Sequence, residues 1–272
     1  MTFRYLSSLC LLWSTAAILL GCGGGGGGPP NSNNPVNVEA GVYQGALGAR
    51  DFITGLTPTS WGGQWYGLHY AASSTSGIED PNIYSGPLQG LNSRTATATF
   101  RYFPINSSYA SVSNGTASLT APGSSQLSGD LDLRPAIPVS TFSAAPIGAF
   151  TFNRAATLQE ISGDWTGRLS YGAGYNAALK LSVSADTGRV SEVTFGVDCK
   201  WTTPNFHVTA DTAVNLFKLD LTMSQSTSCD FSTKSLTGVA FVFNSTVANK
   251  TQRLIWVATT STGQGISFKA DR

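Results

Sequence analysis

Residues 179–201 read LKLSVSADTGRVSEVTFGVDCKW, and this stretch decides the fold class. Apolar and polar residues alternate from Leu179 to Ser184, and the alternation resumes from Val193 to Trp201 after the turn-forming residues ADTGR. A period of two is typical of half-buried β-strands, because successive side chains point to opposite faces of a sheet. We therefore expect a β-hairpin with one apolar face, on which Cys199 lies.

The same alternation recurs along the rest of the chain. It covers Phe217–Met223 and Val239–Phe243, and no amphipathic helical pattern follows residue 21. In the expected last strand, Ile266 and Phe268 point inward while Ser267 and Lys269 point outward. The pattern predicts an all-β protein.

The composition excludes several classes of protein. Only 11% of the 272 residues are charged, and 16 basic side chains stand against 15 acidic ones. Nucleic-acid binding requires a basic surface that a net charge of +1 does not supply. Low charge together with 11% aromatic residues is also the opposite of a disordered composition. We expect a folded chain with no nucleic-acid partner.

Three short matches indicate that one unit is repeated. They are GVYQGAL (41–47) with GDWTGRL (163–169), LSG (127–129) with LTG (236–238), and an expected strand at 150–154 with 266–270. Their offsets are 122, 109 and 116 residues and their order is the same, which favours a tandem duplication. Each half, 39–155 and 156–272, is long enough for about eight short strands.

Two tandem antiparallel up-and-down β-barrels are the fold that we predict, with a β-sandwich in each half as the alternative. Closing a sheet into a barrel removes the exposed strand edges. The G-x-W opening and the closing segments Trp256–Thr259 and Ile266–Phe268 resemble the first and last strands of avidin- and lipocalin-type barrels. A single membrane-spanning barrel is the less favoured alternative, because the chain ends KADR rather than on an aromatic residue.

The N-terminus has the features of an export signal. Arg4 precedes the apolar run Leu9–Leu20, which is short for a bilayer span. The residues LLGC at 19–22 resemble a bacterial lipobox, which implies that 1–21 are removed and that Cys22 carries the lipid. Gly23 stands where that family has Asp for inner-membrane retention, so the resemblance implies the outer membrane. An ordinary cleaved signal or an anchor helix is the alternative.

A flexible tether follows Cys22. Residues 23–38 read GGGGGGPPNSNNPVNV, without apolar periodicity. As a coil this length has a root-mean-square span of roughly 20–24 Å. The lipobox and polyglycine together resemble surface lipoproteins of the transferrin-binding type, which carry eight-stranded barrels.

Two cysteines remain for the mature domains. Cys10 lies in the signal and Cys22 is the lipid site, which leaves Cys199 and Cys229. Two cysteines in an exported domain favour a disulfide, which would stabilise the fold by roughly 3–4 kcal/mol. A metal pair or a nucleophilic thiol is the alternative, although neither has a nearby CxxC or a matching histidine.

The aromatic segment around residues 61–70 is the sharpest local feature of the first half of the chain. Trp61, Trp65, Tyr66, His69 and Tyr70 form a possible ligand wall. In the alternative interpretation this is a strand that fills the barrel interior and leaves its alternate side chains exposed.

No complete catalytic or metal-binding set is visible. HExxH and GxSxG motifs are absent, and the two histidines, His69 and His207, lie in different halves. Asp130 and Asp132 share one strand face, which would suit calcium or acid–base chemistry, but a solvated outer face explains them as well. We expect no cofactor, no metal and no catalysis.

The sequence thus predicts a non-catalytic lipoprotein anchored to the outer membrane that acts as a binding or adhesion module. Its partner is then a protein or a small apolar ligand. A periplasm-facing envelope accessory or enzyme inhibitor, and a carrier of a small apolar ligand, are the alternatives. The face of the membrane on which the protein lies is left open.

Overall fold

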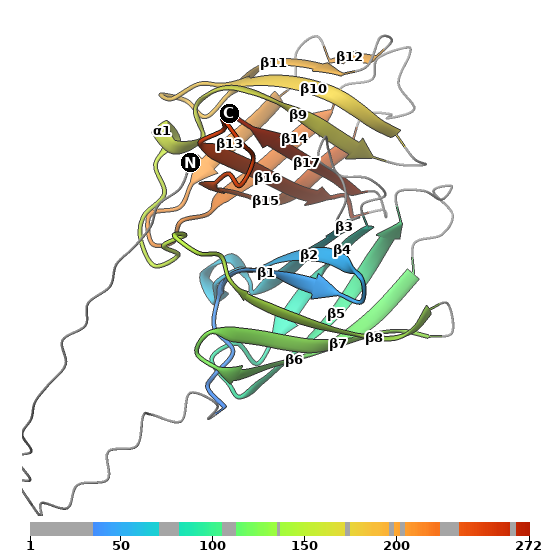
Figure 1. The fold of residues 1–272 in the computed structure, drawn as a ribbon. Coiled ribbons are helices and arrows are strands. Elements are labelled where there is room, and N and C mark those ends of the chain that lie inside the picture. Colours follow the sequence, from blue (N-terminus) through green and yellow to red (C-terminus); the bar gives the residue numbers. More distant parts are fainter. Residues whose placement is uncertain are drawn as a thin grey trace, which may run out of the picture. The chain divides into compact units, whose positions relative to one another are not determined.

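A computed structural model of the chain describes residues 35–70, 82–104, 113–134, 137–171, 175–195, 199–201, 205–223, 234–261 and 265–272. Antiparallel strands make up most of these residues, as Figure 1 shows. They form two successive barrel-like sheets, which confirms the predicted fold class.

The first sheet is a closed barrel of eight strands in chain order. They are β1 (Gly41–Leu47), β2 (Arg50–Leu56), β3 (Gln64–Tyr70), β4 (Asn82–Gln89), β5 (Thr95–Pro104), β6 (Ser113–Gly123), β7 (Gln126–Leu133) and β8 (Ile137–Pro146). A short 3-10 helix, η1 (Thr59–Trp61), joins β2 to β3. The barrel closes where β1 pairs with β8, so this sheet has no free edge.

The second sheet has nine strands in the order β12-β11-β10-β9-β17-β16-β15-β14-β13. They are β9 (Gly163–Tyr171), β10 (Tyr175–Val183), β11 (Val190–Phe195), β12 (Cys199–Trp201), β13 (Asn205–Ala210), β14 (Phe217–Met223), β15 (Lys234–Asn244), β16 (Gln252–Thr259) and β17 (Gly265–Asp271). Next to β11, Arg189 forms a bridge with His207, and the Val208 N–H donates to the Gly188 carbonyl at 3.0 Å. These contacts bring the two sides of the sheet together into a barrel-like form.

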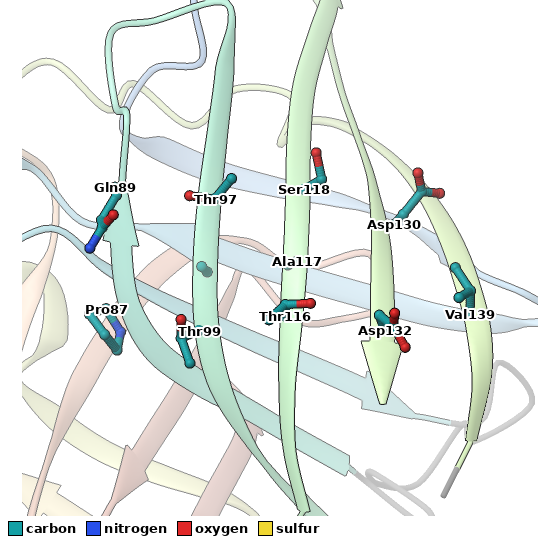
Figure 2. Close-up of a pocket in the computed structure, with 11 residues that line it drawn as sticks. Pro87, Gln89, Thr97, Thr99, Thr116, Ala117, Ser118, Asp130, Asp132 and Val139 are labelled. Atoms are coloured by element: carbon teal, nitrogen blue, oxygen red, sulfur yellow. The ribbon is translucent and has the colours of Figure 1, made fainter. Parts of the chain in front are cut away.

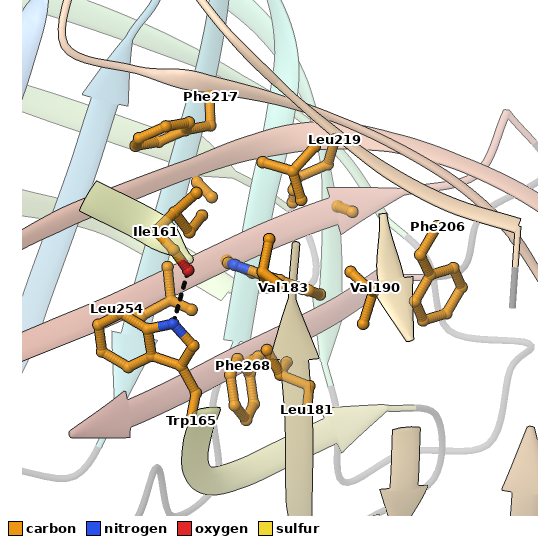
Figure 3. Close-up of a cluster of buried hydrophobic side chains, with 14 of the residues drawn as sticks. Ile161, Trp165, Leu181, Val183, Val190, Phe206, Phe217, Leu219, Leu254 and Phe268 are labelled. Atoms are coloured by element: carbon orange, nitrogen blue, oxygen red, sulfur yellow. Dashed lines mark hydrogen bonds between the residues drawn. The ribbon is translucent and has the colours of Figure 1, made fainter. Parts of the chain in front are cut away.

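Inward-facing apolar side chains fill both sheets, as the alternation predicts. In the first barrel, Phe52, Trp65 and Phe100 are at most 1% exposed. In the second, Leu181 and Val183 of the expected hairpin lie in one cluster with Phe206, Phe217 and Phe268 (Figure 3). Small β-barrels bury their interior side chains in this way, so the interiors are packed cores.

One turn of helix, α1 (Leu158–Ile161), contributes to the core of the second sheet. Thr157 and Glu160 form a capping box at its start, which pairs otherwise unsatisfied backbone N–H groups. Ile161 is fully buried, and its carbonyl accepts a hydrogen bond of 2.8 Å from the indole N–H of Trp165 (Figure 3).

A third apolar cluster joins the outer faces of the two sheets, and we call it the junction. Its main members are Val42, Ile53, Leu68, Tyr70, Ile83 and Phe103 from the first sheet and Val239, Phe241, Phe243, Ile255 and Val257 from the second. Ser267 and Lys269 of β17 point outward as expected, but they are 0% and 9% exposed. Outward positions of these strands are therefore buried instead of solvated.

The expected single strand from Val193 to Trp201 is wrong. The chain forms two strands there, β11 and β12, which pair antiparallel with Phe195 opposite Cys199. Alternation alone does not mark the point at which a chain reverses, but Gly196 and Asp198 are residue types that favour turns.

Of the three internal matches, one lies on strands that occupy equivalent positions in the two sheets. The motif G-x-aromatic-x-G-x-L opens both sheets, on β1 and β9, and each of these strands pairs with the last strand of its sheet. A Cβ atom on Gly45 or on Gly167 would lie 2.0 Å from a carbonyl oxygen of that last strand. Glycine is needed at both positions because the backbones approach so closely.

The other two matches do not relate equivalent strands. LSG at 127–129 lies on β7, next to the last strand of its sheet, whereas LTG at 236–238 lies on β15, one strand further from the end. The expected strand at 150–154 is wrong, because these residues form no strand and β8 already ends at Pro146. The tandem duplication therefore stays a prediction.

Candidate functional site

The structure divides the five predicted aromatic candidates between two surroundings. Trp65 and His69 point into the first barrel, because β3 alternates. Tyr66 and Tyr70 point the other way, toward the junction, where η1 also places Trp61. The five side chains therefore do not form one wall.

The inward pair belongs to the barrel interior. Trp65 is fully buried and donates its indole N–H to the Thr54 hydroxyl at 2.6 Å. Its ring centroid lies 5.0 Å from that of Phe100 and 6.0 Å from that of Tyr84. These contacts occupy the space that an apolar ligand would need in this part of the barrel.

His69 lies above Trp65 on the same inward face. Both ring nitrogens are buried. Burial, and then the positive charge of Arg50, lower the pKa of His69 to about 4, with a weak opposing effect from the Leu47 backbone. The imidazole is therefore neutral at pH 7.

The alternate side chains of β3 are covered, so the expectation that they are exposed is wrong. Leu68 is fully buried and Tyr70 is 3% exposed. The Lys269 ammonium lies 5.3 Å from the centroid of the Tyr70 ring. Burial raises the pKa values of both Tyr66 and Tyr70 to about 12, so both phenols stay protonated.

Trp61 connects the two sheets through polar contacts. Its indole N–H donates to the Asp211 carboxylate at 2.6 Å, and the Lys218 ammonium lies 4.6 Å from its ring centroid. Burial alone would raise the pKa of Asp211, but the backbone N–H groups of Ala213 and Val214, the Trp61 N–H and the Lys218 charge together lower it. Asp211 is thus ionised and fixes the orientation of Trp61.

Beside Trp61, a pocket of about 400 Å³ opens between the two sheets, and we call it the junction pocket. The first sheet and η1 contribute Thr57, Trp61, Gln64 and Tyr66 to its lining. The second sheet contributes Thr209, Lys218, Asp220 and Thr237. Two aromatic side chains therefore share the pocket with polar side chains and two opposite charges, and the four polar side chains of the second sheet are exposed.

Strand register explains how these polar side chains come together. On the outer face of β14, Lys218 and Asp220 stand two residues apart. Lys218 lies opposite Thr209 of β13, and Asp220 lies opposite Thr237 of β15. The sequence shows Lys218 and Asp220 as polar members of an alternating strand, but it contains no signal that Trp61 lies against them.

A second hollow, of about 480 Å³, lies on the outer face of β4 to β8 (Figure 2). Most of its labelled side chains are polar, including Thr97, Ser118 and Asp130, and the apolar ones are Pro87, Ala117 and Val139. Asp132 pairs with Arg134 at 2.5 Å, and the hydrogen bonds from the Arg134 side chain and backbone lower its pKa to about 2. This surface has no aromatic side chain and fits the solvated outer face expected for Asp130 and Asp132.

The part of the chain that the structure describes contains neither a grouped metal-ligand set nor a membrane-spanning helix. There, no three side chains of His, Cys, Asp or Glu are grouped so as to hold a metal ion. Nor does any described helix have the length and apolar character needed to cross a bilayer. Cys22 and Cys229 lie outside the described residues, as does the side chain of Cys199, so the lipid and the disulfide stay predictions.

Comparison of this chain with protein families, with curated proteins and with solved structures finds no match.

Proposed function

We propose that this protein is a non-catalytic, lipid-anchored binding module of the outer membrane, and that the junction pocket is its binding site. The observation that carries the proposal is the convergence of Trp61 and Tyr66 with Lys218 and Asp220. Ligand sites are commonly found where two structural units meet, with apolar walls and a few polar groups that orient the ligand.

The fixed position of Trp61 supports a binding role. The Asp211 carboxylate accepts a hydrogen bond from the edge of its ring, and the Lys218 ammonium lies over the ring face. A side chain that is already ordered loses less conformational entropy when a ligand arrives, so more of the contact energy appears as affinity.

The filled interiors weigh against the alternative of an apolar-ligand carrier. Trp65 and Phe100 occupy the first interior, and Trp165 and Trp256 are at most 2% exposed in the second. A ligand would have to displace these side chains, at a cost of several kcal/mol.

The anchor is tested with the full chain in a bacterial host. Cys22→Ser should abolish incorporation of labelled palmitate and release the protein from the outer-membrane fraction. Cys10→Ser is the matched control, because Cys10 lies in the segment that we expect to be removed. Retention of the label in Cys22→Ser would contradict the lipid anchor.

The side of the membrane is tested with proteinase on intact and permeabilised cells. Digestion in intact cells supports a surface adhesion role. Protection until permeabilisation would instead support the envelope-accessory role, in which the same pocket faces a periplasmic partner.

The site itself is tested by adhesion of vesicles that carry the full lipoprotein to immobilised proteins, polysaccharides and lipids. We expect the double variant K218A/D220A to lose at least about tenfold in retention on the target that binds. Thr97→Ala, on the outer face of β5, is the control and should bind like the wild type. Equal loss in both variants, or loss in neither, would contradict the assignment of the site.

A further inference from the structure

We infer that the junction pocket takes a neutral carbohydrate, one or two sugar rings in size. The inference rests on the proposed function, since it names the class of ligand for the same pocket. Four properties of the pocket lead to it: its charge, its hydrogen-bonding groups, its aromatic rings and its volume.

The charges that line the pocket balance. Lys218 and Asp220 are two residues apart on the same face of β14, so a positive and a negative group reach the same space. Asp211 is held by the Trp61 indole and by two backbone N–H groups and is not part of the lining. Because the two charges are opposite, the pair gives no net attraction for a ligand of either sign, and each member can hydrogen-bond to the polar groups of a neutral ligand.

The hydrogen-bonding groups are of both kinds. The Lys218 ammonium only donates, the Asp220 carboxylate only accepts, and the hydroxyls of Thr209 and Thr237 do either. The Gln64 amide adds a donor and an acceptor from the first sheet. A sugar hydroxyl also donates and accepts, whereas an apolar ligand would desolvate these groups without pairing them.

The aromatic rings supply the apolar part of the pocket. Sugar rings expose C–H groups on their faces, and these groups pack on aromatic rings as other apolar groups do. Tyr66 is a protonated phenol at neutral pH. Trp61 is held from its edge by Asp211 and has the Lys218 ammonium over its ring, so a sugar can pack only on the part of that ring that Lys218 leaves uncovered. A ligand with hydroxyls around its rim and C–H groups on its faces matches both kinds of wall.

The volume limits the size of the ligand. About 400 Å³ lies near the lower end of the range of roughly 300–1,000 Å³ that is usual for small-molecule sites. A monosaccharide or disaccharide unit fits this space, and a longer glycan would continue outside it.

The test uses the full lipoprotein in a zwitterionic detergent, because glycoside detergents would compete. The probes are methyl glycosides of glucose, galactose, mannose and N-acetylglucosamine, with maltose, cellobiose and chitobiose as disaccharides. Titration calorimetry and saturation-transfer NMR should show that at least one neutral sugar binds. Glucose 6-phosphate serves as the anionic comparator, glucosamine as the cationic one, and decanoate as an anion with a long apolar chain, and each should bind more weakly.

Two conservative variants test the pocket and leave the apolar side chains of the junction unchanged. Thr237→Val and Gln64→Leu each remove hydrogen-bonding capacity at similar volume and should weaken sugar binding about five- to tenfold. The matched control is Thr97→Val on the outer face of β5, which should leave the affinity unchanged. Circular dichroism of all three variants checks that the sheets are intact.

The outcomes separate this inference from the proposed function. Sugar binding that is weakened by the pocket variants and not by the control supports both. Binding of decanoate or glucose 6-phosphate in preference to every neutral sugar overturns the carbohydrate class. If K218A/D220A abolishes adhesion to an immobilised protein while no sugar binds or competes, the carbohydrate inference is overturned and the proposed function stands. If no pocket variant changes adhesion or sugar binding, both are overturned.

Discussion

The outward faces of two groups of strands, β5–β7 and β15–β17, differ in their surroundings although both groups belong to antiparallel barrel-like sheets. On β5, Thr95, Thr97 and Thr99 are exposed while the residues between them are buried. On β16, six consecutive residues from Arg253 to Ala258 are buried. A strand with apolar side chains on both faces packs on both faces, so the composition of the outward positions indicates where a second sheet will lie.

The largest expected effect comes from an outward aromatic side chain in the junction. Phe241 is 1% exposed, so Phe241→Ala should cost about 3–5 kcal/mol of the free energy of unfolding through lost burial and a residual cavity. Thr97→Ala, at an outward position of β5, should change it by less than about 0.5 kcal/mol. Urea unfolding followed by fluorescence measures both, and equal costs would show that the junction is not formed in solution.

The next largest difference is expected between two ion pairs, Arg253–Asp271, which is mostly buried, and Arg134–Asp132, which is more exposed. The Arg253 and Asp271 side chains are 8% and 17% exposed and lie 2.8 Å apart, whereas those of Arg134 and Asp132 are 67% and 32% exposed. Asp271→Asn leaves a buried guanidinium without its counter-charge and should cost about 3 kcal/mol. Asp132→Asn should have no measurable effect, because exposed pairs are screened by water. A comparable loss in the two variants would mean that burial does not distinguish the pairs.

A smaller loss of stability is expected where β1 pairs with β8 and closes the first barrel. Gly45→Ala would place a Cβ atom 2.0 Å from the Ser143 carbonyl oxygen, so the strands must separate, at a cost of about 1–3 kcal/mol. Gly55→Ala is the matched control, because no atom lies within 4 Å of its Cβ position. Thermal unfolding should show a lowered midpoint for the first variant only, and an unchanged midpoint for both would contradict the close approach of β1 and β8.

The smallest effect concerns a polar side chain on an inward face. The ordinary pKa of histidine is 6.5, and burial and Arg50 lower that of His69 to about 4 in the folded chain. Between these values the unfolded chain binds more protons, so the free energy of unfolding falls as the pH is lowered from about 6.5 toward 4. The fall in the free energy of unfolding is smaller than the full shift in pKa would give, because His69 is only half-buried and water screens part of the effect.

His69→Gln should flatten this part of the pH profile. His207→Gln is the control, because His207 is exposed on the outer face of β13, and the fall should persist in that variant. Urea midpoints measured from pH 4 to pH 7 compare the two. An unchanged profile in His69→Gln would show that another group is responsible.

Much of the fold follows from alternation alone. The inward positions of Leu181, Val183, Phe217 and Phe268 were predictable because a period of two assigns every second side chain to one face. The break between β11 and β12 and the absence of a strand at 150–154 were not. A reversal or an irregular connection interrupts backbone pairing without disturbing the order of apolar and polar residues.

The candidate site was predictable only in part. Trp61 and Tyr66 stood out as aromatic residues, but Lys218 and Asp220 looked like ordinary polar residues of an outer strand face. Their role depends on the distance between residues about 150 positions apart, and no local pattern encodes that distance. By contrast, the alternation within β3 is a local pattern, and it places Trp65 and His69 on the inward face, away from the pocket.

The sequence by itself determined that this chain forms antiparallel sheets and which side chains fill their interiors, because burial of alternate residues is a local property of each strand. It also contains the lipobox-like LLGC and the glycine-rich tether that predict an anchored protein. Only the tertiary structure decided that the outer faces of β3 and β15–β17 are covered and that Trp61 meets Asp211 and Lys218. Those contacts join segments far apart in the chain, and their free energy is gained only when both sheets are complete and packed against each other.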